Sequence, residues 1–233
     1  MPRVLVVQNT PGGGPRRLGD WLTEDGLTLD TVPAWDGAPP PDRLEHDALL
    51  VLGGGFLPDE DDRAPWLAAT RALAAEALDR GTPYLGICLG GQLLAQVAGG
   101  TVQGCHGEPE IGSTPLTVRP EADTDPLFHG LPQRVTAVER HVDSVTALPP
   151  DATWLMESEH HPYQAFRVGE RAWGVQYHPE IGADRLREWD QDALRELGVD
   201  PEVVLRTADR DEEAAAPVWR TVAHRFAEVV AHG

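Results

Sequence analysis

The feature that most constrains the fold is a repeated succession of a short apolar segment, a glycine-containing turn and a helical segment. Apolar segments typical of buried strands lie at residues 3–8, 27–32, 47–52 and 83–87. Apolar residues recur at helical spacing over 64–80, before Gly81, and over 90–98, before Gly99. Buried strands that alternate with helices predict a largely parallel sheet with helices on both faces.

The pattern changes after this alternation to short strand-like segments without long helices between them. Such segments lie at residues 115–119, 134–141, 153–157, 164–168 and 172–177. We expect them to add antiparallel strands to the edge of the parallel sheet. Helical patterns return over 183–197 and 214–230, and the acidic runs 59–62 and 209–213 are expected to be solvated loops or helix starts. The length of 233 residues predicts one domain, 1–233.

Charge and composition exclude several classes of function. The formal net charge of −19 argues against a binder of nucleic acid and against an anchor on an anionic membrane, because both need basic surfaces. The chain contains no lysine, which excludes a Schiff-base lysine, a pyridoxal-phosphate anchor and a complete P-loop. The N-terminus lacks the pattern of a signal peptide, and no apolar run is long enough to span a bilayer, so we expect a cytoplasmic protein.

The segment around Cys88 has the spacing of a nucleophile elbow. A strand runs into a helix through a turn in which Gly86 and Gly90 flank Cys88 at two residues on either side. Such a turn is expected to lift the cysteine sulfur clear of the sheet and into solvent, at a helix N-terminus that favours the thiolate. The alternative is a buried structural cysteine, which is the usual role of a lone cysteine in an α/β core.

A second segment, residues 172–180, supplies a matching base. It is an apolar strand that ends in His178-Pro179-Glu180. Positions two apart on an extended backbone face the same side, so Glu180 is expected to orient the His178 ring and to fix its proton. Cysteine, histidine and glutamate would then lie at the carboxyl ends of parallel strands, where open α/β sheets place their sites.

These two segments resemble the signature motifs of the class I glutamine amidotransferases. The motifs are Gly-Ile-Cys-Leu-Gly-Gly-Gln at 86–92 and Gly-Val-Gln-Tyr-His-Pro-Glu at 174–180. The segment 50–55 resembles the oxyanion strand of the family, and the segments 107–112 and 164–169 resemble free-standing relatives of the GMP synthetase amidotransferase domain. The resemblance covers about residues 4–182 and leaves C-terminal helices over 183–233. It implies a flavodoxin-like, largely parallel sheet with added antiparallel strands.

The resemblance also implies a role for individual residues. Cys88 would attack a γ-glutamyl amide to form a thioester, His178 would move the protons and Glu180 would orient His178. The backbone amides of Leu89 and Gly55 would hold the oxyanion. The positions that would line the substrate pocket are Gly54, Gln92, His141, Val142 and Asp143. No cofactor and no metal is implied.

Two positions depart from the family pattern, and two further pairs of residues are weaker candidates. Gly91 follows the second glycine of the elbow, where the family often has His or Ala, and Phe56 follows the oxyanion glycines in place of Pro. Both departures bear on which substrate fits. The pairs Cys105-His106 and His160-His161 suggest a metal, but no ligand pair has the spacing of a zinc site on one element. A disulfide between Cys88 and Cys105 is not expected in the cytoplasm.

Three functions are compatible with these residues. The first is a glutaminase that releases ammonia for a synthetase on a separate polypeptide. The second is a self-contained γ-glutamyl hydrolase or peptidase, in which water resolves the same thioester and the product is an amine. The third is a binding or regulatory protein without turnover, which the intact Cys88, His178 and Glu180 argue against. We favour the first and expect a small-molecule γ-glutamyl substrate.

Overall fold

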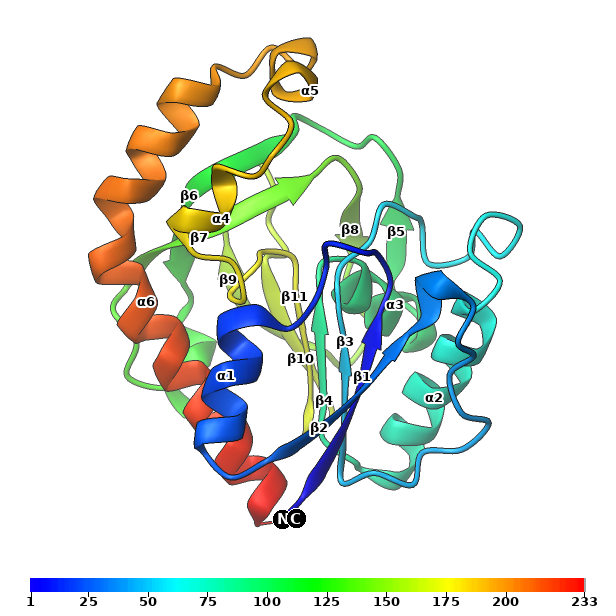
Figure 1. Cartoon of the computed structure of the whole chain (residues 1–233). Coiled ribbons are helices and arrows are strands. Elements are labelled where there is room, and N and C mark those ends of the chain that lie inside the picture. Colours follow the sequence, from blue (N-terminus) through cyan, green and yellow to red (C-terminus); the bar gives the residue numbers. More distant parts are fainter. Residues whose placement is uncertain (233) are drawn as a thin grey trace.

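The predicted apolar segments form the parallel half of a nine-stranded sheet in the computed structural model, which describes residues 1–232 (Figure 1). The strand order is β2-β1-β3-β4-β11-β10-β9-β6-β7. The five parallel strands are β1 (Arg3–Gln8), β2 (Thr28–Pro33), β3 (Ala48–Val51), β4 (Tyr84–Ile87) and β11 (Ala172–Val175). The predicted parallel core is therefore confirmed, but the segment 172–177, expected among the antiparallel edge strands, forms β11, which pairs parallel to β4 in the middle of the sheet.

The second half of the sheet is antiparallel and extends one edge, as predicted. Its strands are β6 (Glu110–Val118), β7 (Arg134–His141), β9 (Thr153–Glu157) and β10 (Ala165–Val168). β6 begins five residues before the predicted strand. A small separate sheet, which the sequence pattern does not predict, pairs β5 (Thr101–Gln103) with β8 (Ser144–Ala147). These two strands are too short for apolar alternation to be recognised.

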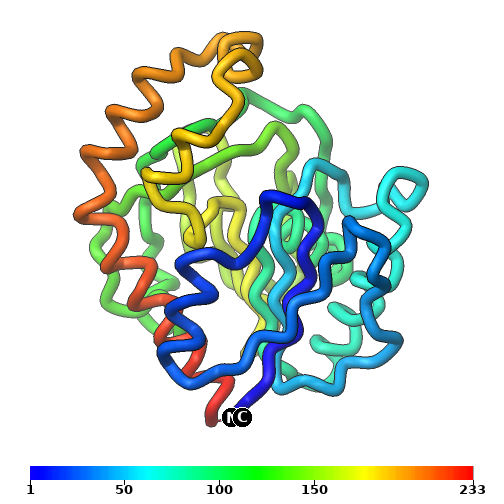
Figure 2. The backbone as a smooth tube through the Cα atoms, viewed as in Figure 1, coloured from blue at the N-terminus to red at the C-terminus, as the bar shows by residue number. Residues whose placement is uncertain are grey.

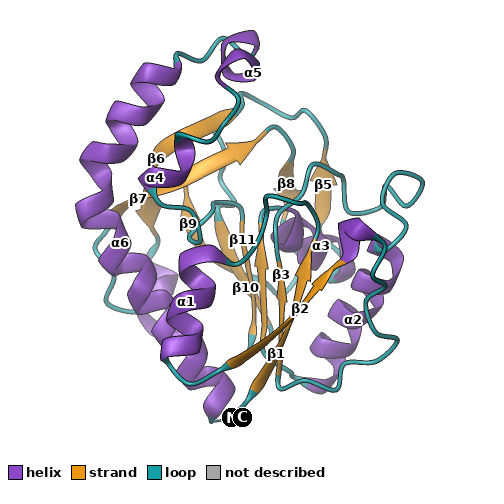
Figure 3. Ribbon diagram, viewed as in Figure 1, coloured by secondary structure: helices purple, strands orange, loops and turns teal. Residues whose placement is uncertain are grey.

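Helices cover both faces of the sheet (Figure 3). The helices α1 (Arg16–Glu24) and α6 (Pro201–Ala231) pack on one face, and α2 (Leu67–Arg80) and α3 (Leu89–Val97) pack on the other. Alternate residues of β1 show the two layers, because Val4 and Val6 belong to the core under α1 and α6, and Leu5 and Val7 belong to the core under α2 and α3. Each such buried side chain contributes roughly 1.5–3 kcal/mol.

The helices after residue 182 differ from those predicted from the sequence. Residues 183–197 form two short helices, α4 (Ala183–Leu186) and α5 (Gln191–Glu196), because Asp190 caps the start of α5 through the backbone amides of Asp192 and Ala193. The helix predicted over 214–230 starts at Pro201. The acidic run 209–213 therefore lies inside α6, where Glu212 pairs with Arg17 at 2.6 Å.

The helix α6 packs against α1 and against the antiparallel strands β6 and β7. In Figure 2 its tube passes beside that of α1, and the two helices are joined by an ion pair of 2.6 Å between Arg220 and Asp25. Trp219 is buried, donates a hydrogen bond to the Thr136 carbonyl at 3.0 Å and stacks on Tyr177. Among residues 1–232, none of the helices combines the length and the apolar character that a membrane crossing requires.

Backbone atoms are in close contact where α3 meets the sheet. A Cβ atom on Gly90 would overlap the carbonyl of Val51 on β3, and a Cβ atom on Gly86 would overlap the carbonyl of Gly90. A Cβ atom on Gly91 would lie 2.7 Å from the carbonyl oxygen of Val175 on β11. Gly91, which departs from the family pattern, therefore lies where α3 approaches β11 too closely for a side chain.

The contact at Gly90 generates a stability prediction. Gly90→Ala should lower the free energy of unfolding by about 3 kcal/mol, because the new methyl group forces α3 away from β3. The measurement is the midpoint of chemical denaturation. Gly14→Ala is the matched control, because its Cβ atom meets nothing closer than 3.9 Å. Equal midpoints for the two variants would contradict the close packing at the start of α3.

Candidate active site

Cys88 occupies the turn between β4 and α3 in a strained backbone conformation. Its φ is 51° and its ψ is −109°, a region that costs a non-glycine residue about 1–3 kcal/mol. Two hydrogen bonds hold the turn: Cys88 donates its amide to the Val175 carbonyl at 2.8 Å, and its own carbonyl accepts from the Gln92 amide at 2.9 Å. The strain is maintained because neighbouring elements fix both sides of the residue.

The sulfur of Cys88 is less accessible than predicted. The residue is 6% exposed, so the expectation that its side chain projects into solvent is wrong. Gly53 follows β3 and lies against both Cys88 and His178, since a Cβ atom on Gly53 would be 3.5 Å from Cys88 Cβ and 2.9 Å from His178 Cε1. Cys88 instead faces a cavity. Cys88 and Cys105 are both free thiols, as expected.

His178 and Glu180 lie beyond the end of β11, the strand beside β4. His178 Nδ1 and Glu180 Oε1 are 2.7 Å apart, and both residues are buried. The predicted strand over 172–177 ends at Val175, so the pair is formed in a turn and not on extended backbone. His178 donates its amide to the Val138 carbonyl of β7 at 2.8 Å. This bond ties the turn to the antiparallel half of the sheet.

The surroundings of His178 favour its protonated form. Burial alone lowers the pKa of His178, but the Glu180 carboxylate and the neighbouring Cys88 outweigh burial and hold this pKa well above its usual value. The arrangement keeps a proton on an imidazole beside a thiol. A cysteine, a protonated histidine and an orienting carboxylate are the parts of a nucleophilic site.

A cavity of about 490 Å³ opens over these three residues. Gly53, Gly54 and Gly55 line it on one side. The remaining lining residues are Thr10, Gly12, Gly13, Arg16, Arg140, Ile181, Arg185, Glu188 and Trp189. The motifs do not predict Arg16, Arg185 or Trp189 as part of this site. Arg16 has a positive φ of 46°, which the sequence does not signal, and the other two residues come from α4 and the turn that follows it.

Of the residues expected to hold an oxyanion, Leu89 directly follows Cys88, and Gly55 lines the same cavity as Cys88. Leu89 is the first residue of α3, where backbone amides have no partner within the helix. Gly55 is exposed and lines the cavity, and Gly54 lies between Asn9 and Leu89. Phe56, the second departure from the family pattern, packs edge-on against Trp66. The oxyanion roles of Gly55 and Leu89 stay predictions.

The other residues expected to bind substrate lie behind Cys88 and do not line the cavity. Gln92 donates from Nε2 to the Asp143 carbonyl at 3.0 Å and to Gln176 Oε1 at 3.1 Å. Gln176 Nε2 in turn lies 3.6 Å from Cys88 Sγ. His141 contacts the same Asp143 carbonyl, and Val142 is half-buried beside them. Substrate binding by Gln92, His141, Val142 and Asp143 stays a prediction, as it does for Gly54.

Comparison with known proteins gives consistent results. Residues 22–189 match the family model for glutamine amidotransferase class-I. The chain is 34% identical over 193 residues to a glutamine-hydrolysing GMP synthase of Aeropyrum pernix. This match covers 81% of this chain and 36% of that protein. It is also 30% identical over 171 residues to one subunit of the glutamine-hydrolysing GMP synthase of Methanopyrus kandleri. This match covers 73% of this chain and 83% of that polypeptide.

A solved structure is similar over nearly the whole length. A glutamine amidotransferase of Thermotoga maritima superimposes with a TM-score of 0.87 at 29% identity, covering 97% of this chain and 98% of that one. The chain itself spans about a third of the length of the GMP synthase of Aeropyrum pernix.

The His178–Glu180 pair generates a prediction for titration. Glu180→Gln should lower the pKa of His178, because the variant removes the carboxylate that favours the imidazolium. NMR titration of the ring protons measures this pKa in the folded chain. Glu188→Gln is the matched control, because Glu188 lines the same cavity but pairs with Arg185 at 2.7 Å. If the His178 titration is the same in all three proteins, Glu180 does not govern its charge.

Proposed function

Because the chain belongs to the class I glutamine amidotransferase family, we propose that it hydrolyses the side-chain amide of glutamine through a thioester on Cys88. The observation that carries the proposal is the strained Cys88 beside the 2.7 Å His178–Glu180 pair, at the bottom of a cavity. The three side chains follow directly on the ends of the neighbouring parallel strands β4 and β11, so the sheet sets the positions of the turns that carry them.

In the first half of the proposed reaction, the Cys88 thiolate attacks the amide carbon of glutamine. The developing oxyanion accepts hydrogen bonds from the backbone amides of Leu89 and Gly55, and a donor of this kind is worth about 3 kcal/mol in the transition state. His178 gives its proton to the amide nitrogen, the carbon–nitrogen bond breaks and ammonia leaves. The glutamyl group stays on the sulfur as a thioester.

In the second half, water resolves the thioester. His178, now neutral, takes a proton from the water as the oxygen attacks the thioester carbon. The carbon–sulfur bond breaks, glutamate leaves and the thiolate–imidazolium pair is restored. Glu180 holds the ring in one orientation, which stabilises the imidazolium each time it forms.

The ammonia needs an acceptor, and we propose that it is used by a synthetase on a separate polypeptide. The relatives support this arrangement: the GMP synthase of Aeropyrum pernix extends well beyond the matched region, and the protein of Methanopyrus kandleri is one subunit of its GMP synthase. A synthetase partner of the same kind is the proposed partner of this chain.

A second candidate is hydrolysis of a γ-glutamyl conjugate that carries an anionic group. Two arginines that line the cavity, Arg16 and Arg140, form no ion pair with a carboxylate among residues 1–232. Arg140 lies over the ring of Trp189, 4.8 Å from its centroid. Guanidinium groups in a cavity much larger than ammonia are suited to a carboxylate or phosphate on the departing amine.

The first test is the release of glutamate and ammonia from glutamine by the purified chain. Turnover by the chain alone supports the glutaminase proposal, and activation by a synthetase partner supports the division of the reaction between two polypeptides. A chain that leaves glutamine intact but cleaves γ-glutamyl peptides would establish the second candidate. A folded chain that cleaves none of them, with or without the partner, would contradict both.

Substitution of the two cysteines tests the nucleophile. Cys88→Ala should lower kcat by at least about 10⁴-fold, because no covalent intermediate can form. Cys105→Ala should leave kcat unchanged, because Cys105 is exposed and lies outside the cavity. The measurement is the rate of glutamate release. Substantial activity in Cys88→Ala that disappears in Cys105→Ala would move the nucleophile to Cys105.

Substitution of the other two residues tests their separate roles. Glu180→Gln should lower kcat less than His178→Ala does, because Glu180 orients the ring whereas His178 transfers the proton. The alkaline limb of the pH profile reports loss of the His178 proton, so Glu180→Gln should also move this limb to lower pH. The reverse ranking of kcat, or an unmoved limb, would refute the assignment.

A further inference from the structure

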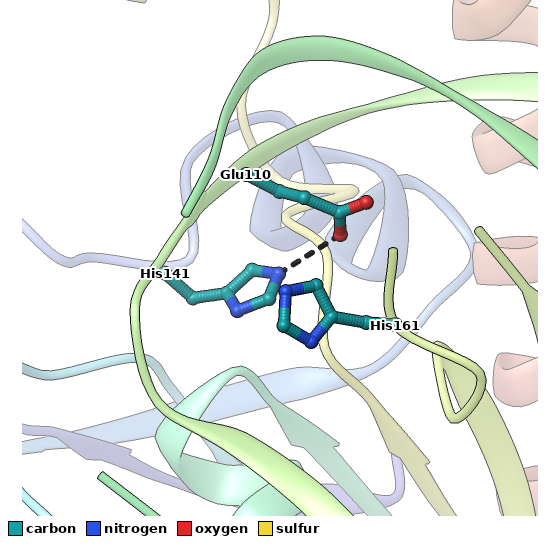
Figure 4. Close-up of side chains that lie close together, drawn as sticks. All are labelled: Glu110, His141 and His161. Carbon is teal, nitrogen blue, oxygen red and sulfur yellow. Dashed lines mark hydrogen bonds and ion pairs between the residues drawn. The ribbon is translucent and has the colours of Figure 1, made fainter. Parts of the chain in front are cut away.

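A second cluster of polar side chains lies away from the cavity, in the antiparallel half of the sheet (Figure 4). Glu110 begins β6 and His141 ends β7, and the two residues are directly opposite in the β6–β7 pairing. His161 reaches the same point from the loop between β9 and β10. One possible ligand atom from each of the three lies within 4.8 Å of the other two, and all three residues are buried.

A second buried carboxyl group lies beside the cluster, next to His141. Glu139 is two residues before His141 on β7 and therefore points to the same face of the strand. Its Oε2 lies 3.5 Å from His141 Nε2, and Glu110 Oε2 lies 3.1 Å from the same nitrogen. One imidazole nitrogen therefore faces two carboxylates whose side chains are 0% and 3% exposed.

The cluster has more acceptors than donors. Both carboxylate oxygens of Glu139 and the Oε1 atom of Glu110 are buried without a hydrogen-bond partner. Among residues 1–232, no arginine forms an ion pair with either carboxylate. Buried carboxyl oxygens without a hydrogen-bond partner are costly, and a bound metal ion would give them one.

The geometry around His141 fits a metal ligand. Its Nδ1 lies 3.0 Å from the Asp143 carbonyl oxygen, so the ring can donate its proton there and leave the Nε2 lone pair directed at the cluster. Ligands of a tetrahedral zinc ion at about 2.0–2.2 Å are about 3.4 Å apart. The distances of 3.1 and 3.5 Å from Nε2 to the two carboxylates lie on either side of this value.

We propose that Glu110, His141 and His161 form a binding site for a divalent transition-metal ion such as Zn²⁺, with Glu139 beside it. Two imidazoles and one carboxylate are a ligand set that zinc sites use, with the fourth position taken by water. His161 Nε2 now contacts the Glu108 carbonyl at 2.7 Å and would exchange this bond for the ion. Residues 103–109 are exposed, and two of them, Gly107 and Glu108, lie against His161.

The site is connected to the proposed nucleophile by hydrogen bonds. The Asp143 carbonyl accepts from His141 and from Gln92, Gln92 also bonds Gln176, and Gln176 contacts Cys88 Sγ. An ion that fixes the His141 ring would therefore fix the wall behind Cys88. The proposed site includes none of Cys88, His178 and Glu180, and it shares only His141 with the residues predicted to line the substrate pocket.

The test is Zn²⁺ binding by the full chain carrying Cys88→Ala, which removes metal binding at the proposed nucleophile. Calorimetric titration, with metal analysis after gel filtration, should give one equivalent. Adding His161→Ala or Glu110→Gln should weaken binding by at least about 100-fold. His160→Ala is the matched control, because this neighbouring histidine is exposed and outside the cluster, and it should bind Zn²⁺ normally.

Two results would overturn the proposal. The first is the absence of Zn²⁺ binding by the folded Cys88→Ala chain. The second is binding that persists in His161→Ala and Glu110→Gln. If His161→Ala does not fold, His161→Gln replaces it, and the readout is the Tm with Zn²⁺ and after chelation. Zn²⁺ should raise the Tm of the His160→Ala chain and leave that of the His161→Gln chain unchanged; an equal rise in both contradicts the site.

Discussion

The close contact of the first turn of α3 with strands β3 and β11 is the constraint on which the proposed site depends. Glycine at 86, 90 and 91 lets backbone touch backbone there, and the strained Cys88 is held between Val175 and its own helix. The same contact brings Gly53, two residues after β3, against Cys88 and the His178 ring. A bulkier residue in the turn would separate the sulfur, the imidazole and the glycine loop at once.

The two halves of the sheet contribute differently to the region around Cys88. The parallel half supplies the carboxyl ends of β3, β4 and β11, and thus the glycine loop, the cysteine and the histidine. The antiparallel half supplies the wall behind them: β7 accepts the His178 amide at Val138 and ends at His141. Buried acids and amides concentrate in this wall. The added strands therefore do more than widen the sheet, because they determine the polarity behind the proposed nucleophile.

The strands of the parallel core, the helices that follow them and the grouping of Cys88, His178 and Glu180 could be predicted from local patterns. Each depends on short motifs in which spacing and backbone geometry are directly linked. What could not be predicted depends on contacts distant in sequence. The start of α6 at Pro201 is obscured because the charged residues 209–213 interrupt its apolar pattern, and Asp190 divides a continuous helical pattern by capping. The burial of Cys88, the positive φ of Arg16 and the meeting of Glu110, His141 and His161 arise only when separate elements pack.

The position of β11 in the middle of the sheet also bears on how the chain folds as it is made. β4 and β10 are joined only through β11, and the face under α6 stays uncovered until residues 201–231 follow. Once the first 170 residues have left the ribosome, the chain holds the strands of two incomplete half-sheets, each with an unpaired edge and an apolar face. Emergence of β11 joins the halves and also brings His178 to Cys88. During synthesis, completion of the sheet and assembly of the proposed site are therefore a single late event, and the nascent chain before it is the form that most needs a chaperone.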